Sequence, residues 1–350
     1  MKFNEPNNAL DMYLDILKKD STNSNALVGI SWLYGKLNYF ALGYPYLCSV
    51  VELAEVDFDR KLKVAELYLN GKTNRIGEDS INLIYQGLVK DTGLTSVFLS
   101  EYVSYLYSRR DYSTAEKYCK TAIRKFPEDY TSWDYYFNIL LVLNRVHALN
   151  TESLKALEYF PNQAQVYFYV GYSYFLLKKY KESVENLEMG IDYVIENEEL
   201  EKQFYLTLAE CYHNMGKDKE SDKYFDNYLA IDSTNAYLMN NYAYYLAKRN
   251  NNLNKALQLS RKSIEIEPFN SSFLDTYSWI LFTLSEYDKA LNYIQRAYKY
   301  GGNKNPVILE HYGDILIKLG NTAEAIDRWK DAYQLNKSDK ILKKITGAGG

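Results

Sequence analysis

The side chains that could perform catalysis or bind a metal ion are scattered along this sequence. The histidines and cysteines are His147, His213, His311, Cys48, Cys119 and Cys211. Neither set has the close spacing of a metal site. The chain also has no glycine-rich nucleotide loop and no nucleophilic serine motif. We therefore predict no catalytic residue, no metal and no cofactor, and we do not expect the protein to be an enzyme.

Charge and composition narrow the classes of partner. The chain has 350 residues, with 41 basic and 45 acidic side chains and a net charge of −4. A nucleic-acid partner held by phosphate contacts needs concentrated Lys and Arg, so none is expected. No apolar run reaches the roughly 18 residues that a membrane span needs, so no membrane span is expected. The 37 tyrosines suit a chain with a large, partly exposed surface, because Tyr packs its ring and keeps its hydroxyl wet.

Small residues recur with one spacing in nine segments. In one of them, Gly313 is followed by Ala325 after 12 residues and by Ala332 after 7 more. The first position of each segment, here called the anchor residue, is Ser31, Ala65, Val103, Phe137, Gly171, Ala209, Ala243, Ser278 or Gly313. Paired helices approach closely only where the side chains at their crossing are small. A period near 34 residues therefore predicts stacked helical hairpins.

This pattern resembles the tetratricopeptide repeat family, whose motif is W-x2-L-G-x2-Y, then A-x3-F, then a late A and P. The ninth segment carries the likeness in Tyr312, Gly313, Leu316, Gly320, Ala325, Trp329 and Ala332. The resemblance implies an all-α, right-handed superhelical solenoid of stacked antiparallel helix pairs, as a single domain over residues 5–338. The expected repeats start near residues 24, 58, 96, 130, 164, 202, 236, 271 and 306, with a half-repeat at 5–20 and a terminal helix or tail at 339–350.

Three departures from the pattern carry expectations of their own. Phe137 and Leu149 are bulky where small residues belong, which predicts either a kink near residues 130–165 or compensated packing without one. Two segments are 38 residues long. We expect extra residues after Asn70 and an extended helix over residues 191–201. Residues 5–20 have the pattern of the second helix of a pair, and the first helix of that pair is missing from the sequence. We therefore expect the protein to begin upstream of Met1, with a leader or lipid anchor such as that of a bacterial lipoprotein.

The resemblance also implies where a partner binds. In this family the first helix of each pair lines the concave surface, at positions set by the anchor residue. Those positions predict the partner-binding residues Trp32, Asp134, Asn138, Phe168, Tyr172, Phe175, Glu210, His213, Tyr237, Asn240, Tyr244, Asp275, Trp279, Phe282, Glu310 and Asp314. Aromatic and acidic side chains dominate the set, and basic ones are nearly absent. An aromatic, acidic groove favours a protein or peptide with basic or apolar anchors. The alternative use of these aromatic side chains is contact between neighbouring repeats.

Three functions remain open at this point. The first is a non-catalytic scaffold that binds a segment of a partner protein in the groove. The second is a component of cell-envelope assembly, or a glycan-binding protein, because aromatic rings also stack on sugars. The third is a structural spacer in a larger complex. The last three repeats resemble those of bacterial envelope-associated members. We expect a periplasmic or envelope-anchored protein if a leader was removed, and a cytoplasmic one otherwise.

Overall fold

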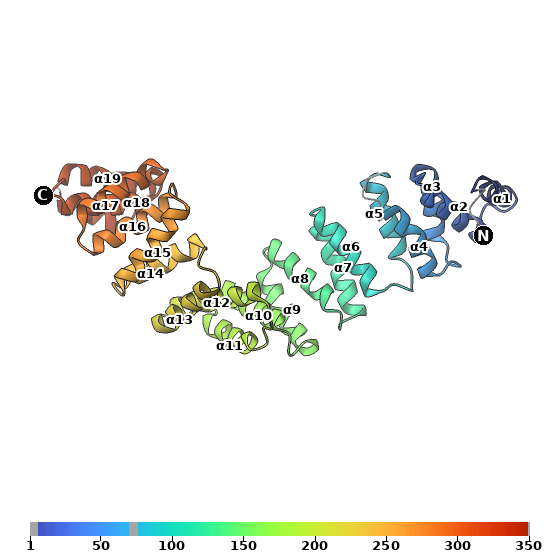
Figure 1. The fold of residues 1–350 in the computed structure, drawn as a ribbon, viewed down its shortest axis with the longest axis horizontal. Coiled ribbons are helices and arrows are strands. Elements are labelled where there is room, and N and C mark those ends of the chain that lie inside the picture. Colours follow the sequence, from blue (N-terminus) through green and yellow to red (C-terminus); the bar gives the residue numbers. More distant parts are fainter. Residues whose placement is uncertain (1–5, 70–75, 349–350) are drawn as a thin grey trace. The chain divides into compact units, whose positions relative to one another are not determined.

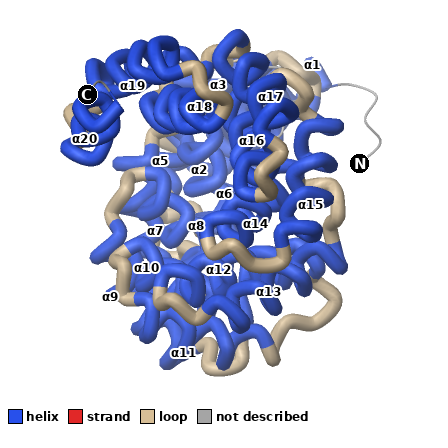
Figure 2. Tube along the Cα trace, turned by 90° about the vertical axis from the view of Figure 1, so that its left-hand side faces the viewer, coloured by secondary structure: helices blue, strands red, loops and turns tan. Residues whose placement is uncertain are grey.

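The computed structural model describes residues 6–69 and 76–348, and every regular element within them is a helix (Figures 1 and 2). The helices form two compact units, Met1–Leu177 and Lys178–Gly350, and each unit is described by itself. The predicted all-α fold of stacked helix pairs is confirmed.

The N-terminal unit contains ten helices among its described residues. They are α1 Pro6–Lys19, α2 Ser24–Lys36, α3 Phe40–Glu52, α4 Phe58–Leu69, α5 Glu78–Leu88, α6 Ser96–Ser108, α7 Tyr112–Lys125, α8 Tyr130–Val142, α9 Val146–Tyr159 and α10 Ala164–Leu176.

The C-terminal unit contains ten α-helices and one short 3-10 helix among its described residues. They are α11 Tyr180–Ile191, α12 Glu198–Asn214, α13 Asp218–Ile231, α14 Ala236–Lys248, α15 Leu253–Ile266, α16 Ser271–Thr283, α17 Tyr287–Lys299, η1 Gly302–Lys304, α18 Pro306–Lys318, α19 Thr322–Leu335 and α20 Asp339–Ala348.

The even-numbered helices from α2 to α18 carry the anchor residues and are called first helices here; the odd-numbered helices that follow them are called second helices. Within the C-terminal unit, α14 packs on α15, α16 on α17 and α18 on α19. First helices also contact one another along the stack, as α14 does with α16 and α16 with α18. The first helices therefore form one continuous surface within that unit.

Small side chains at the helix crossings make these pairs close. The hydroxyl of the anchor Ser278 is buried in its crossing and donates to the carbonyl of Ala290, 2.7 Å away. In the pair α12 and α13, Ser221 of the second helix donates to the carbonyl of the anchor Ala209 at 2.9 Å. At Gly313 the Trp329 indole takes the space where a Cβ would lie. At these three crossings the spacing rule has a direct cause, because the paired helices leave room only for a hydrogen, a methyl group or a hydroxyl.

The turn inside each pair also follows from the anchor. The residue seven positions after it has a positive φ in all the turns that the structure describes; these residues are Asn38, Arg110, Asn144, Lys178, Gly216, Asn250, Ser285 and Gly320. This is the left-handed residue that commonly ends a helix. Glycine and asparagine adopt it readily, whereas Ser285, at φ 63°, does so at a cost.

One expectation about helix length is wrong. The segment 191–201 is not one extended helix, because α11 ends at Ile191 and α12 begins at Glu198. Asn197 stands before α12 in a non-helical conformation, and its side chain accepts a hydrogen bond from the backbone N–H of Leu200. This cap fixes the start of the helix. The extra residues form a loop and lengthen the start of α12. The expected insertion after Asn70 lies outside the described residues.

Two expectations about the domain stay predictions. Phe137 and Leu149 are both fully buried between α8 and α9, and the Phe137 ring lies 4.8 Å from that of Tyr169. Their bulk is therefore accommodated in the core, and the kink near residues 130–165 stays a prediction. So does the single solenoid over 5–338, because the two units are described separately.

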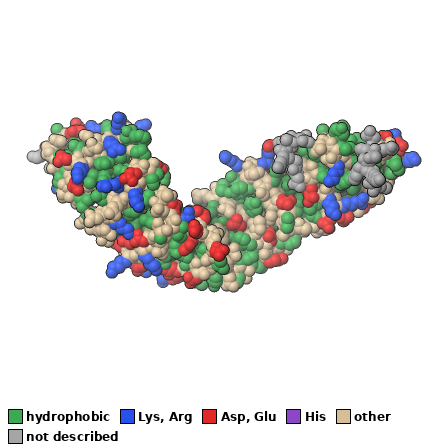
Figure 3. Space-filling view, in the orientation of Figure 1, with side chains coloured by type: hydrophobic (Ala, Val, Ile, Leu, Met, Phe, Trp, Pro, Cys, Tyr) green, Lys and Arg blue, Asp and Glu red, His purple; other side chains and the backbone are tan. Residues whose placement is uncertain are grey.

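The surface of the C-terminal unit carries both signs of charge. On the face that Figure 3 shows, Lys and Arg are interspersed with Asp and Glu rather than gathered into one patch. Among the described residues, no helix has the length and apolar character needed to cross a membrane.

Candidate partner-binding surface

The sixteen predicted residues all lie on first helices, in both units. Trp32 lies on α2, Asp134 and Asn138 on α8, and three aromatic residues on α10; the other ten lie on α12, α14, α16 and α18. The part of each first helix that carries them is called the first-helix surface. No group of His, Cys, Asp or Glu within the described residues could hold a metal ion.

Asp134 and Asn138 of α8 meet a tyrosine that the sequence analysis did not select. The Tyr169 hydroxyl on α10 donates to Asp134 Oδ1 at 3.0 Å, and Asn138 Nδ2 donates to the same hydroxyl at 3.0 Å. Burial raises the pKa of Asp134 above its usual value, although its bonds with Tyr169 and Tyr130 oppose the rise. This carboxyl group is therefore bonded within the chain.

The α10 aromatics stack along their own helix. The Phe168 and Tyr172 rings are nearly parallel, with centroids 5.5 Å apart, and Phe175 follows Tyr172 at 6.0 Å. Phe168 is buried, whereas Tyr172 and Phe175 are partly exposed. On α2, the half-buried Trp32 has the Lys36 ammonium 5.6 Å from its ring centroid. The aromatic character predicted for this surface is present on both helices.

Glu210 and His213 of α12 both contact Tyr245 of α14. The Tyr245 hydroxyl donates to Glu210 Oε2 at 3.0 Å, and the His213 ring stacks on the Tyr245 ring at 3.6 Å. Burial raises the pKa of Glu210, against the opposing effect of the Tyr245 bond. Burial also lowers the pKa of His213, helped by the charges of Arg249 and Lys248.

Asp275, Trp279 and Phe282 of α16 form one assembly with His311 of α18. Asp275 Oδ1 and His311 Nδ1 are 2.9 Å apart, and the His311 ring stacks on Trp279 with centroids at 4.1 Å. Phe282 stacks on the indole of Trp279 at 4.8 Å. Burial acts to lower the pKa of His311, but Asp275, Asp314 and Glu310 outweigh it and raise the pKa.

Glu310 and Asp314 of α18 are paired with lysines of α20. Lys344 Nζ lies 2.6 Å from Glu310 Oε1 and 2.6 Å from Asp314 Oδ2, and Lys340 lies 2.9 Å from Glu310 Oε1. Trp329 Nε1 donates to Asp314 Oδ1 at 3.0 Å. Burial acts to raise the pKa of Glu310, but the two lysines outweigh it and hold the pKa below its usual value.

The three remaining residues lie on α14. Tyr237 is 59% exposed, with its ring edge-on to Phe273 at 5.0 Å. Tyr244 is partly exposed beside Tyr245. Asn240 is buried, and its Oδ1 accepts no hydrogen bond from any described residue. Of the three, Tyr237 and Tyr244 present ring surface to solvent.

A common arrangement emerges from these contacts. Asp134, Glu210 and Asp275 each contact a polar residue of the next first helix. That residue stands two positions before its anchor in the contacts of Asp134 and Asp275, and two positions after its anchor in the contact of Glu210. The partners are Tyr169, Tyr245 and His311. Sequence reasoning missed the two tyrosines, and no single position marks both, because Tyr169 precedes Gly171 by two residues and Tyr245 follows Ala243 by two. It also missed Lys344, which stands 34 residues after Glu310.

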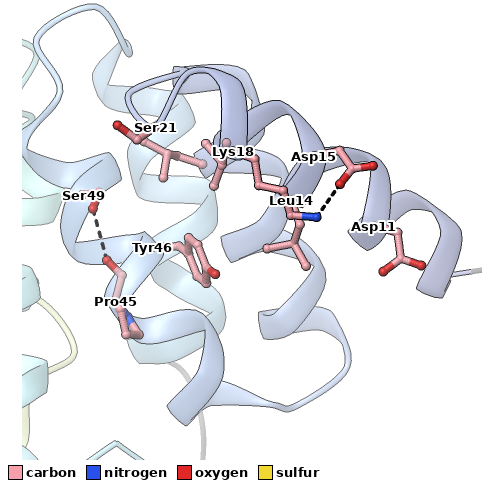
Figure 4. A pocket seen from close by; sticks show the side chains of 10 residues that line it. Asp11, Leu14, Asp15, Lys18, Ser21, Pro45, Tyr46 and Ser49 are labelled. Carbon is pink, nitrogen blue, oxygen red and sulfur yellow. Dashed lines mark hydrogen bonds and ion pairs between the residues drawn. The ribbon is translucent and has the colours of Figure 1, made fainter.

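Two pockets of the N-terminal unit lie away from the predicted site residues. One of about 920 Å³ opens between α1 and α3, where Leu14, Pro45 and Tyr46 form apolar walls beside the Asp15–Lys18 ion pair (Figure 4). A second, of about 420 Å³, is lined by α7, α8 and α9. Neither pocket contains a predicted site residue.

Comparison with known proteins agrees with the helical-pair architecture. The family model that matches the chain is described as a tetratricopeptide repeat and covers residues 156–338. A tetratricopeptide repeat protein from Parabacteroides merdae is 14% identical with a TM-score of 0.52, over 73% of this chain and 99% of that chain. YrrB, described as a TPR protein with an unusual peptide-binding site, is 20% identical with a TM-score of 0.46, over 52% and 92%. Yeast Tom70 is 16% identical with a TM-score of 0.43, over 99% and 85%. No curated protein matches the chain.

Proposed function

Because the chain belongs to the tetratricopeptide repeat family, we propose that it is a non-catalytic scaffold that binds a segment of a partner protein on its first-helix surface. The repeat fold supports protein–protein interaction, and arrays of this kind bind along the surface that consecutive repeats share. The finer proposal is that the segment carries basic or apolar anchor residues.

The observation that carries this proposal is the aromatic assembly on α16 and α18. Trp279, Phe282 and His311 are stacked face to face, so their rings are held rigidly. Trp279 and Phe282 remain partly exposed. A rigid, partly exposed aromatic surface gains contact area at little entropic cost. An arginine laid over such a ring would add about 0.5–2 kcal/mol.

Affinity capture from the native cell with matched variants tests the proposal. The test bait carries Tyr172→Ala and Trp279→Ala, one substitution on the first-helix surface of each unit. The control bait carries Tyr159→Ala and Tyr300→Ala, which remove exposed aromatic rings at the ends of second helices, again one in each unit. We expect a partner that binds the wild-type and control baits and is lost from the test bait.

Other outcomes point to the other functions. Equal capture by all three baits would contradict binding at the first-helix surface and favour a structural spacer that engages its complex elsewhere. A soluble glycan that quenches tryptophan fluorescence in the wild type but not in the test variant would favour the glycan-binding alternative. The compartment stays a prediction, and cell fractionation with an antibody to the chain tests it.

A further inference from the structure

Helix α20 is held to the C-terminal unit by ion pairs as well as by apolar contacts. One of its side chains, Ile341, is buried, at 2% exposure, while Ile345 and Ala348 pack partly against the core. The first helix before it, α18, buries Ile308, Leu309, Tyr312, Gly313, Ile315 and Leu316. The apolar attachment of α20 is therefore smaller than that of the first helix α18.

The polar attachment of α20 is concentrated in one site on the first-helix surface. Lys344 Nζ contacts both oxygens of Asp314, at 2.7 and 2.6 Å, and Glu310 Oε1 at 2.6 Å. Its ammonium group also lies 5.9 Å from the ring centroid of Trp329. The carboxylates are mostly shielded, with side-chain exposures of 15% for Glu310 and 17% for Asp314. Two shielded carboxylates and an indole form a well-defined receptor for one ammonium group.

The second lysine extends the contact toward the rest of that surface. Lys340 lies one helical turn before Lys344 and contacts Glu310 at 2.9 Å while its own side chain is 74% exposed. The pKa of Lys340 is raised first by its bond to Glu310, and Tyr244 of α14 adds to the rise. The start of α20 therefore lies against Glu310 of α18, which is one of the residues of the first-helix surface. It lies over the surface on which we place the partner segment.

We propose that α20 is a resident ligand of the first-helix surface, and that a basic amphipathic helix of a partner binds by displacing it. The proposal rests on the function proposed above and names the chemistry of the partner. Such a helix has two lysines four residues apart, each followed by an apolar residue, as in Lys340-Ile341 and Lys344-Ile345. The receptor for its second lysine is Glu310, Asp314 and Trp329.

A peptide with the sequence of α20 itself tests the proposal in the full chain. The probe is fluorescein-labelled DKILKKITGA, residues 339–348, and the readout is fluorescence anisotropy. In the wild type the site is filled by α20, so we expect weak binding. In the variant Lys340→Gln/Lys344→Gln the resident helix loses its ion pairs, and the probe should bind at least about tenfold more tightly. A probe with both lysines replaced by Gln should bind neither chain.

The control variant is Lys343→Gln/Lys318→Gln, which changes the net charge equally at two exposed lysines. It should bind the probe as weakly as the wild type. Equal probe affinity for all three chains, or equal binding of the Gln probe, would overturn the proposal. Circular dichroism establishes that the variants keep their helices.

Hydrogen exchange gives a second measurement on the unsubstituted protein. Excess probe should reduce the protection of amides 339–348 and leave α17 protected. Unchanged protection of α20 at saturating probe would show a permanent cap and overturn the proposal. Failure of the proposed function would give a different result. The bait with Trp279→Ala would then capture the partner as well as the wild type does, while the α20 probe would still bind the lysine variant.

Discussion

Substitution of glycine by alanine at two equivalent positions should have opposite effects. Gly313 is the anchor of α18, and Gly347 stands 34 residues later in α20. A Cβ at Gly313 would lie 2.5 Å from Cδ1 and 2.9 Å from Cε2 of the Trp329 indole. Nothing lies within 4 Å of a Cβ at Gly347. The same change of residue therefore meets a filled crossing in one helix and open space in the other.

The expected magnitude follows from these distances. Carbon atoms pack best at about 3.5–4.0 Å, so the indole must move by roughly 1 Å. Overpacking of this kind costs about 1–3 kcal/mol. The movement also strains the Trp329–Asp314 hydrogen bond, and bonds to charged groups contribute about 1.5–3 kcal/mol. Alanine regains about 1 kcal/mol as the better helix former. We expect Gly313→Ala to lower the free energy of unfolding by about 1–4 kcal/mol, and Gly347→Ala to leave it unchanged or raise it by up to about 1 kcal/mol.

Urea unfolding, followed by circular dichroism, measures the change in the free energy of unfolding of the whole protein. Hydrogen exchange in α18 and α19 measures the local change, and it is needed because repeat arrays can unfold in parts. Trp329→Phe in the Gly313→Ala background should recover part of the loss, since it shrinks the group that clashes, and a double-mutant cycle quantifies the recovery. If Gly313→Ala proved as stable as Gly347→Ala, the explanation of the anchor spacing by close crossings would be wrong.

Three further outcomes are expected. Ser285→Gly should raise the free energy of unfolding by about 0.5–1 kcal/mol, and Gly320→Ser should lower it by a similar amount, because both positions need a positive φ. If the urea midpoints of the two variants moved in the same direction, this explanation would be wrong. The pKa of His311 is raised in the folded protein, so the stability it contributes is complete below its unfolded pKa of about 6.5 and is lost as the pH rises through the folded pKa. His311→Asn should therefore cost more stability at pH 5 than at pH 9, and a pH-independent difference in thermal midpoints would refute it. The pKa of Glu210 is also raised, so folding disfavours its ionised form. Glu210→Gln keeps an acceptor for Tyr245 and should raise the urea midpoint at pH 8, with less effect at pH 4. A lower urea midpoint of this variant at pH 8 would contradict the prediction.

The helix pairs were predictable because their determinants are local in sequence. The small residues Ser278 and Ala290 meet at one crossing, and they stand 12 residues apart. Gly320 signals its turn by residue type, whereas Arg110 and Lys178 occupy the same left-handed position without any such signal. Only the count from the anchor identifies them. The extended helix over 191–201 was wrong because the chain leaves the helical conformation after Ile191: Glu196 has a positive φ, and Asn197 caps the start of α12.

The sequence predicted which residues lie on the first helices, but it did not predict which side chains they contact. The anchor count placed Glu210 and Asp275 on the first helices, where the structure has them. Their partners Tyr245 and His311 lie about one repeat away, and the contacts depend on how far each first helix is rotated relative to the next. That rotation is set by packing along the whole interface and is not encoded in any short motif.

The pairing has a consequence for how a partner would lie on the C-terminal unit. The acids of the first-helix surface are not equivalent: burial raises the pKa of Glu210, whose bond is to a neutral tyrosine, whereas two lysines hold the pKa of Glu310 low. Glu310 on α18 therefore keeps its negative charge more readily than Glu210 on α12, and a partner reaches Glu310 where it displaces α20. The other end of the unit offers the stacked pair of His213 on α12 and Tyr245 on α14. A partner segment with a basic end and an apolar end would place its basic end at α18 and its apolar end toward α12. Under this polarity, Glu310→Gln should weaken a peptide with its lysines at one end and leave an uncharged aromatic peptide unaffected, as isothermal titration would show. Equal weakening of both peptides would place the specificity of the surface in its shape instead of its charge.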